Sequence, residues 1–459
     1  MKTRKILPLI FMMFFLTGLY ANLTLDEAIE ITRKNNKQLK QAREEIIKYK
    51  QDYKDVKGSL FPQLSLSGGF QYKRTEIPDS SIPAMASLTN MLDSTATVND
   101  YTIAGYTEEA LQGFIPEKTS IEKSLTAGLE LNQVVFMGGK LISGIKIAKK
   151  MYNLQEKKYF ITEQDVVFET IKLYLNTILA KNLYEVQQEA LDIANRHFRQ
   201  VNNMYNEGLV SEYDKLRAEL EKQKLEPEVM QAEKNYLLAL KQLRNHLEIE
   251  EKELKLTENI QIPELNKSLA EYLDIGLQQR VEIELSDLNM EINKVNYNYQ
   301  KMNFLPQIGL NMKYNSFAQS ENSIESDDWG NSYEVGVGVS MPLFTGFSNT
   351  AKKVKASHAL TQAKIADRDL TEKIELDIRN SYLTLKSDLQ TVKVQKNNVK
   401  LAEKGLKIAR ARYENQVSNQ LEILDAQLQL KFAKLSQLKA NYAAKISYEK
   451  FKKSIGEKL

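Results

Sequence analysis

The sequence of 459 residues contains no cysteine. The chain can therefore form no disulfide, no cysteine-ligated metal or iron–sulfur site, and no lipid anchor on an N-terminal cysteine. Its 63 basic and 60 acidic residues nearly cancel, leaving a net charge of +3. So small a net charge provides no strong field to attract nucleic acid, and we expect no nucleic-acid partner.

Residues typical of catalytic sites are scarce. The three histidines, His197, His246 and His358, are widely separated and have no partner at metal-site spacing. There is no glycine-rich phosphate loop and no Gly-x-Ser-x-Gly nucleophile motif. We therefore expect neither an enzyme, nor a cofactor, nor a resident metal ion.

Long hydrophobic runs are also missing, with one exception at the N-terminus. Lys2, Arg4 and Lys5 precede the mostly apolar run from Ile6 to Tyr20, and the small residue Ala21 follows. The run is shorter than the ~20 residues that a helix needs to span a bilayer. A basic start, a short apolar run and a small residue at the end predict that residues 1–21 are a secretory signal peptide.

The chain repeats itself. Three short patterns occur twice in the same order: Leu60–Leu64 and Phe304–Ile308, Val135–Gly138 and Leu343–Gly346, and Met204–Ala218 and Arg412–Ala426. The last two patterns recur after 208 residues and the first after 244, which leaves 36 extra residues between Pro62 and Phe136. Because the repeats keep their order, we predict an internal tandem duplication, with residues 22–265 as the first structural repeat and 266–459 as the second. The two halves meet near Ile262–Pro263.

The extra segment contains Pro78, Pro83 and Pro116 among many Ser, Thr, Asn and Asp residues. This composition predicts a long loop.

Four segments alternate apolar and polar residues with a period of two, which predicts strands at about 63–73, 124–136, 307–316 and 332–344. Pro62 and Pro306 mark the starts of two strands, and Phe136 and Phe344 mark the ends of the other two. Each segment has about the 9–11 residues that a tilted strand needs to cross a bilayer. A soluble sandwich sheet would alternate in the same way. The polar face is rich in Gly, Ser and Asn, and no second sheet is available to cover the apolar face, so we favour a membrane β-barrel.

Four strands cannot close a barrel, because the smallest membrane barrels have about eight. Open sheet edges do not occur in lipid, so several copies must share one barrel. Two copies would give eight strands and a lumen filled by side chains, whereas three would give 12 strands and a pore. We therefore predict a homotrimer.

Two segments are too long for the helices of an ordinary globular domain. Residues 140–207 and 349–415 lack proline, and each would form a helix of roughly 100 Å. Their narrow apolar stripes require coiled-coil partners. Shorter helices predicted at 25–57, 211–253, 268–302 and 419–453 could supply them. The fold class is thus mainly α with a membrane β-barrel, in which coiled-coil helices form an α-helical barrel on the periplasmic side.

Because it combines these motifs, strands and long helices, the chain resembles the TolC family of outer-membrane efflux proteins. The similarity lies in the paired Pro-Gln strand starts, the paired Phe-x-Gly strand ends and the turns after Tyr205 and Tyr413. It implies a trimer in the outer membrane, reaching into the periplasm, with a 12-stranded barrel. It also implies a passive exit duct for efflux or type I protein secretion, opened by a periplasmic membrane-fusion adaptor and an inner-membrane transporter.

The resemblance also implies a periplasmic entrance at the second turn, formed by Tyr413, Glu422 and Asp425, with Asp214 as the matching acid of the first repeat. Carboxylates at a narrow mouth would favour cations. The alternative is that Glu422 and Asp425 only complement the dipole at a helix start.

The two turns have different residues at the position of the helix C-cap. Gly208 is a candidate helix C-cap. Gln416 stands where the family usually has the turn glycine, and Ser418 where an entrance arginine can occur, so the locking arrangement is left open.

Two other functions fit parts of the pattern. Long amphipathic helices alone would suit a periplasmic coiled-coil adaptor or structural protein without its own pore. The segment from Pro78 to Pro116 would suit a surface adhesin. The export signal and the four alternating segments favour the duct over both.

Overall fold

The computed structural model describes residues 23–76, 92, 95–112, 119–249, 256–257, 264–321, 323–415, 417–418 and 420–459. The predicted signal peptide, the repeat junction near Ile262–Pro263, Gln416 and the three prolines of the predicted loop lie outside these residues. The chain divides into two compact units. Unit 1 comprises Met1–Gln51, Ala148–Lys294 and Ser357–Leu459, and unit 2 comprises Asp52–Ile147 and Val295–Ala356.

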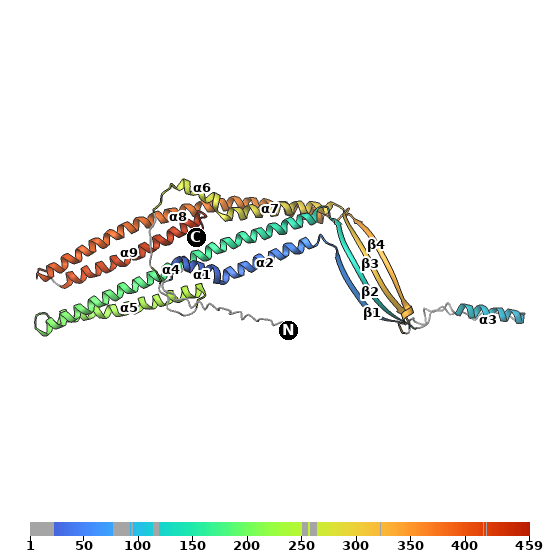
Figure 1. Ribbon diagram of the computed structural model, residues 1–459, viewed down its shortest axis with the longest axis horizontal. Helices are drawn as coiled ribbons and strands as arrows, with labels where there is room; N and C mark the ends of the chain where they lie inside the picture. Colours follow the sequence, from blue (N-terminus) through green and yellow to red (C-terminus); the bar gives the residue numbers. More distant parts are fainter. Residues whose placement is uncertain are drawn as a thin grey trace, which may run out of the picture. The chain divides into compact units, whose positions relative to one another are not determined.

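Unit 2 contains one four-stranded sheet (Figure 1). Its strands are β1 (Gln63–Glu76), β2 (Thr119–Phe136), β3 (Gln307–Ser320) and β4 (Trp329–Ser340). They lie in sequence order, and each pairs antiparallel with the next. Within the described residues, β1 and β4 each have one strand neighbour, so the sheet has two open edges.

The register aligns residues of the same kind across all four strands. One row consists of Leu66, Leu129, Tyr314 and Tyr333. The row one residue away, on the opposite face, consists of Ser65, Glu130, Lys313 and Glu334. Because successive side chains of a strand point to opposite faces, this register separates an apolar from a polar face over the whole sheet.

Two strand boundaries correct the sequence-based prediction. β4 ends at Ser340, so Phe344 lies four residues beyond the strand it was expected to end. Pro342 follows closely, and proline has no N–H to offer a strand ladder. β4 also begins at Trp329, three residues before the predicted start at 332, and Trp329 pairs with Ala318.

The predicted loop between β1 and β2 contains a helix, α3 (Val98–Gln112). Thr97 begins it, since its Oγ1 accepts a hydrogen bond from the Asp100 N–H at 3.4 Å and Asp100 Oδ2 accepts one from the Thr97 N–H at 2.7 Å. This reciprocal cap satisfies backbone donors at the helix start. The flanking prolines indicated a loop, but α3 itself contains none.

Two long helices, α4 (Lys140–Asn206) and α8 (Ser348–Glu414), have 67 residues each and contribute to both units. Each is followed by a shorter helix, α5 (Glu212–Leu247) or α9 (Gln420–Ser454), that runs back alongside it (Figure 1). None of the described helices combines the length and apolar character needed to span a membrane.

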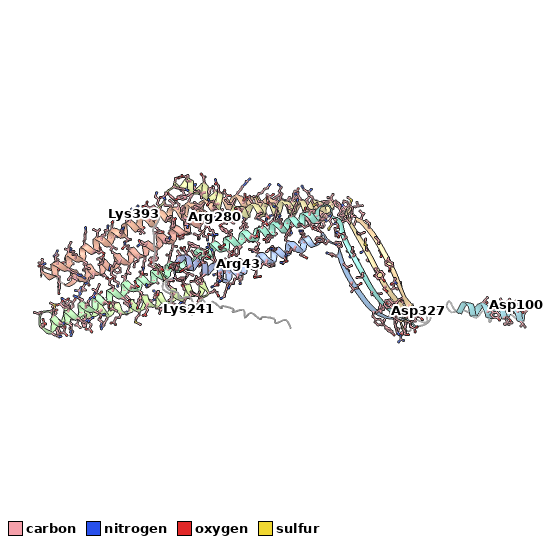
Figure 2. The ribbon with its side chains drawn as sticks, in the orientation of Figure 1. Arg43, Asp100, Lys241, Arg280, Asp327 and Lys393 are labelled. Carbon is pink, nitrogen blue, oxygen red and sulfur yellow. The ribbon has the colours of Figure 1, made fainter. Side chains whose placement is uncertain are left out.

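The remaining helices come in two broken pairs, α1 (Leu25–Asn35) with α2 (Lys37–Gly58) and α6 (Leu269–Gln279) with α7 (Val281–Lys301). Each pair was predicted as a single helix. Asn36 interrupts the first pair and caps α2, because its Oδ1 accepts hydrogen bonds from the N–H groups of Gln38 and Leu39. Arg280 interrupts the second pair (Figure 2). Its guanidinium donates to Asp377 at 3.0 Å and to the Ser454 carbonyl at 2.9 Å.

Apart from α3, the same order of helices and strands occurs twice, with one offset before the inserted segment and another after it. α1 and α6 begin at Leu25 and Leu269, and β1 and β3 begin at Gln63 and Gln307, so both pairs are 244 positions apart. α4 and α8 begin at Lys140 and Ser348, 208 positions apart, like the motifs within them.

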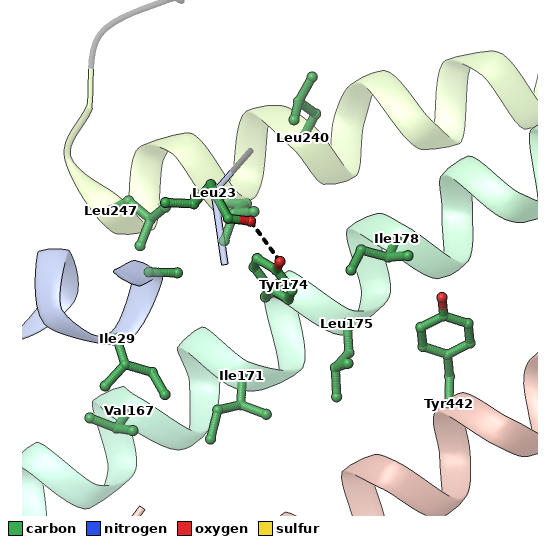
Figure 3. Close-up of a cluster of buried hydrophobic side chains, with 12 residues drawn as sticks. Leu23, Ile29, Val167, Ile171, Tyr174, Leu175, Ile178, Leu240, Leu247 and Tyr442 are labelled. Atoms are coloured by element: carbon green, nitrogen blue, oxygen red, sulfur yellow. Dashed lines mark hydrogen bonds between the residues drawn. The ribbon is translucent and has the colours of Figure 1, made fainter. Parts of the chain in front are cut away.

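A hydrophobic core in unit 1 joins α1, α4, α5 and α9 around Tyr174 (Figure 3). The Tyr174 hydroxyl donates to the Leu23 carbonyl at 2.8 Å and the Thr257 carbonyl at 2.9 Å. Leu23 and Leu256 form a short parallel bridge beside it. Burial of the ring raises the pKa of Tyr174 to about 12. One side chain thus connects the residues before α1 to Thr257, which lies between α5 and α6 in the sequence.

Candidate functional site

The apolar face of the sheet is exposed although it carries large aliphatic and aromatic side chains. Leu66 on β1 is 77% exposed and Val335 on β4 is 71% exposed. Further exposed members are Leu64, Phe70, Tyr72, Tyr333, Val337 and Val339. A face of this kind requires an apolar environment, either another protein surface or lipid.

The opposite face carries a polar network. Glu130 Oε1 accepts hydrogen bonds from Asn132 at 3.1 Å and from Asn311 at 2.9 Å, and it lies 3.6 Å from Lys313 Nζ. At Gly128 an added Cβ would lie 2.5 Å from Asn315 Oδ1. A larger residue there would therefore displace the Asn315 side chain on this face.

Tight turns connect the strands to the long helices. Gly138 and Gly346 have φ of +62° and +58°, a conformation that glycine adopts at little cost. Pro62 and Pro306 stand one residue before β1 and β3. The sequence motif Phe-x-Gly thus marks the turn after the strand, and of its two phenylalanines only Phe136 ends a strand.

Phe347, which the sequence analysis did not single out, also has a positive φ, of +64°. Its ring packs edge-on against Phe344 with the centroids 5.5 Å apart, and both side chains are exposed. Exposed aromatics beside a membrane sheet are typical of the girdle at the lipid–water boundary.

The turn of the first repeat joins α4 to α5. Gly208 has φ of +72°, its N–H donates to the Tyr205 carbonyl, and the Leu209 N–H donates to the Met204 carbonyl. This is a Schellman cap. Asp214 completes a capping box with Ser211, whose N–H and Oγ donate to its Oδ2 at 3.2 and 2.6 Å. Asp214, predicted as an entrance acid, thus has a structural role at the start of α5.

The turn of the second repeat joins α8 to α9. The Val417 N–H donates to the Arg412 carbonyl at 2.8 Å, which matches the Leu209–Met204 bond of the first turn. Tyr413 is half-buried in the last turn of α8, and Asp425 is exposed on α9. Glu422 Oε1 lies 3.4 Å from Arg412 Nε. The arginine at this turn is therefore Arg412, which the sequence did not single out, because the family motif can have an arginine at the position of Ser418.

Further from the turns, a cavity of about 90 Å³ lies between α4, α5, α8 and α9. Its lining includes Ala190, Ile193, Leu406 and Leu428, together with His197, whose pKa burial lowers. Two ion pairs cross between helices at its border. Lys431 Nζ lies 2.6 Å from Glu228 and Lys434 Nζ lies 3.1 Å from Glu189, so that α9 is joined to α5 and α4.

No group of three or more histidine and acidic side chains in the described part of the chain is placed to hold a metal ion. The described residues instead form a sheet with one apolar face, one polar face and two open edges, two helical hairpins, and a turn followed by Glu422 and Asp425.

A profile of the outer membrane efflux protein family matches residues 28–247 and 275–457. The chain belongs to this family. It is accordingly an outer-membrane protein of an efflux channel family.

Individual relatives agree with the family assignment. The outer membrane protein TolC of Vibrio cholerae is 19% identical over 336 residues, which cover 72% of this chain and 76% of TolC. The crystal structure of CusC has a TM-score of 0.76 at 15% identity and covers 95% of this chain and 93% of CusC. The Campylobacter jejuni CmeC outer membrane channel has a TM-score of 0.72 at 17% identity, covering 94% of this chain and 85% of CmeC. At identities this low, the structural matches show only that this efflux family member has the same fold as CusC and CmeC.

Proposed function

We propose that three copies of this chain form a continuous duct, with a 12-stranded barrel in the outer membrane and an α-helical barrel in the periplasm. The observation that carries the proposal is the sheet of four strands with an exposed apolar face and two open edges. Backbone groups at an open edge cannot be left in lipid, so β4 of one copy pairs with β1 of the next. Because the four strands alternate in direction, this new pair is antiparallel, as a membrane barrel requires.

The duct is passive and serves efflux or protein secretion. A periplasmic membrane-fusion adaptor and an inner-membrane transporter open it, and the turns after α4 and α8 form its periplasmic end. The helical hairpins α4–α5 and α8–α9 build the tube wall. Each long helix of 67 residues would span roughly 100 Å along the tube.

The entrance acids are Glu422 and Asp425, with Tyr413 beside them. Glu422 is held by Arg412, whereas Asp425 is exposed and available to face the pore. A ring of three Asp425 carboxylates would attract cations at the narrow end of the duct.

The two repeats arose by duplication of one half. Support comes from the matching lengths of α4 and α8, of α1 and α6, and of β1 and β3. The Schellman-type bonds at both turns add a match at atomic detail.

The proposal is tested with mature protein extracted from the outer-membrane fraction in detergent. We expect a mass of three chains and discrete cation-selective conductance steps in planar bilayers. A vesicle preparation from cells that do not express the chain is the control for contaminating porins. Recovery of a water-soluble monomer without conductance would contradict the proposal.

A further inference from the structure

The helix α3, between β1 and β2, is apolar over much of its surface and yet exposed. Val98 is 82%, Ile103 62% and Tyr106 69% exposed, and Tyr101 is also exposed. At 100° per residue these four side chains cover an arc of about 200°. A helix that is apolar over so wide an arc is normally buried. An isolated helix of 15 residues is also only marginally stable in water, so α3 requires a packing partner.

The position of α3 limits what this partner can be. Glu76 pairs with Thr119, so the connection that holds α3 leaves the sheet at the end opposite to the strand–helix turns. The β3–β4 connection lies at the same end, because Ala318 pairs with Trp329. In a barrel whose helices extend into the periplasm, this end faces the cell exterior.

The composition of α3 argues against a lipid surface. Helices that lie in a membrane interface have a strongly polar face rich in Lys and Arg opposite their apolar face. α3 has no Lys or Arg, and its charged residues are Asp100, Glu108 and Glu109. Its apolar side chains are also spread too widely to define a single buried face.

We propose that the partners of α3 are the α3 helices of the two other copies, which together form a three-helix cap at the outer mouth of the barrel. This inference rests on the proposed trimer. A barrel of 12 strands spaced ~4.8 Å apart and tilted by about 40° has a radius of about 12 Å. The connection from Gln112 to Thr119 can extend to roughly 24 Å. Each α3 can therefore reach the threefold axis, where three such helices bury one another.

The natural absence of cysteine allows a direct test with single-cysteine variants. Val98→Cys, Tyr101→Cys and Tyr106→Cys are purified as full-length protein in detergent and oxidised. At one or more positions we expect disulfide-linked dimers. They should reach a plateau at about two thirds of the chains, because three thiols around an axis can form only one disulfide. Ser65→Cys on the sheet is the matched control and should give no dimers, since its copies lie farther apart than a disulfide can bridge.

The same samples are treated with a lysine-reactive cross-linker to establish the oligomeric state. Trimers without a disulfide at any of the three α3 positions would overturn the cap and leave the duct intact. Absence of trimers would overturn the proposed function itself.

A second measurement examines the mouth of the barrel. Replacing residues 98–112 with a Gly/Ser segment of equal length should speed the labelling of Ser65→Cys by a bulky thiol reagent at least about twofold in the trimer, because the cap restricts entry to the lumen from outside. An unchanged labelling rate in trimers of this variant would show that α3 does not cover the mouth.

Discussion

At the scale of single residues, the structure distinguishes two acidic residues after the α8–α9 turn that the sequence pattern does not distinguish. Glu422 lies in the first turn of α9, where acids complement the helix dipole, whereas Asp425 lies one turn further along the helix. Only Glu422 has a described ion pair, with Arg412. The two acids should therefore respond differently to mutation.

We expect Asp425→Asn to lower the cation-to-anion permeability ratio severalfold, because it removes three charges from the narrow end of the proposed duct. Reversal potentials in a salt gradient across a planar bilayer measure the ratio. Asp214→Asn is the matched control, since Asp214 caps α5. An unchanged ratio in Asp425→Asn would remove this residue from the pore.

Tyr174 offers a second prediction at this scale. Tyr174→Phe removes the hydrogen bonds to Leu23 and Thr257 and should lower the free energy of unfolding by about 1 kcal/mol. Urea unfolding followed by the helical circular dichroism signal at pH 8 measures this difference. The variant keeps the ring, so loss of folding would point to a larger role for the hydroxyl.

The same residue makes stability depend on pH. Tyrosine in the unfolded chain ionises near pH 10, whereas burial raises the pKa of Tyr174 to about 12. Its contribution is fully present below pH 10 and is lost as the pH rises from 10 to 12. The stability advantage of the wild type over Tyr174→Phe should therefore shrink and then change sign over that range, and a constant difference would contradict this account.

At the scale of elements, polar contacts between separate helices join the two helical hairpins. The Lys431 side chain is only 10% exposed, and it crosses from α9 to Glu228 on α5. Removing the acid leaves a nearly buried ammonium without this partner, which costs more than an exposed pair is worth.

We therefore expect Glu228→Gln to loosen α9 and to raise the open probability of the purified channel about fivefold, which corresponds to ~1 kcal/mol. Single-channel recordings measure it, and the charge exchange Glu228→Lys with Lys431→Glu should restore the wild-type value. Glu226→Gln is the control, since Glu226 lies 3.7 Å from Lys222 on the same helix. Equal effects of the two Gln variants would argue against a specific role for the α5–α9 pair.

Elements also differ in how well sequence predicts them. The long helices were predicted to within a residue or two, because their segments lack proline and end at recognisable turns. The breaks at Asn36 and Arg280 were missed, since neither residue is a strong helix breaker. Each break is stabilised by contacts from far along the chain, such as Arg280 with Asp377.

At the scale of the whole molecule, an added charge should destabilise the assembly on one face of the sheet much more than on the other. Leu66→Arg places a charge on the apolar face, and membrane barrels lose about 2–4 kcal/mol for such a change near the bilayer centre. We expect a lower melting temperature of the detergent-extracted assembly, measured by the heat-induced shift on a semi-native gel. Ser65→Arg, one residue away on the polar face, should cause little change. Equal destabilisation by both variants would contradict the assignment of the lipid face.

The sequence by itself determined the class of most segments, although not that of α3. A period of two or of three to four residues, and the presence of proline or glycine, depend only on local geometry and are visible in the chain. The four strands and the long helices followed from them. Only the tertiary structure decided which distant side chains meet, including Arg412 with Glu422, Lys431 with Glu228 and Tyr174 with Thr257. These contacts depend on register and on the packing of separate helices, which no local pattern specifies.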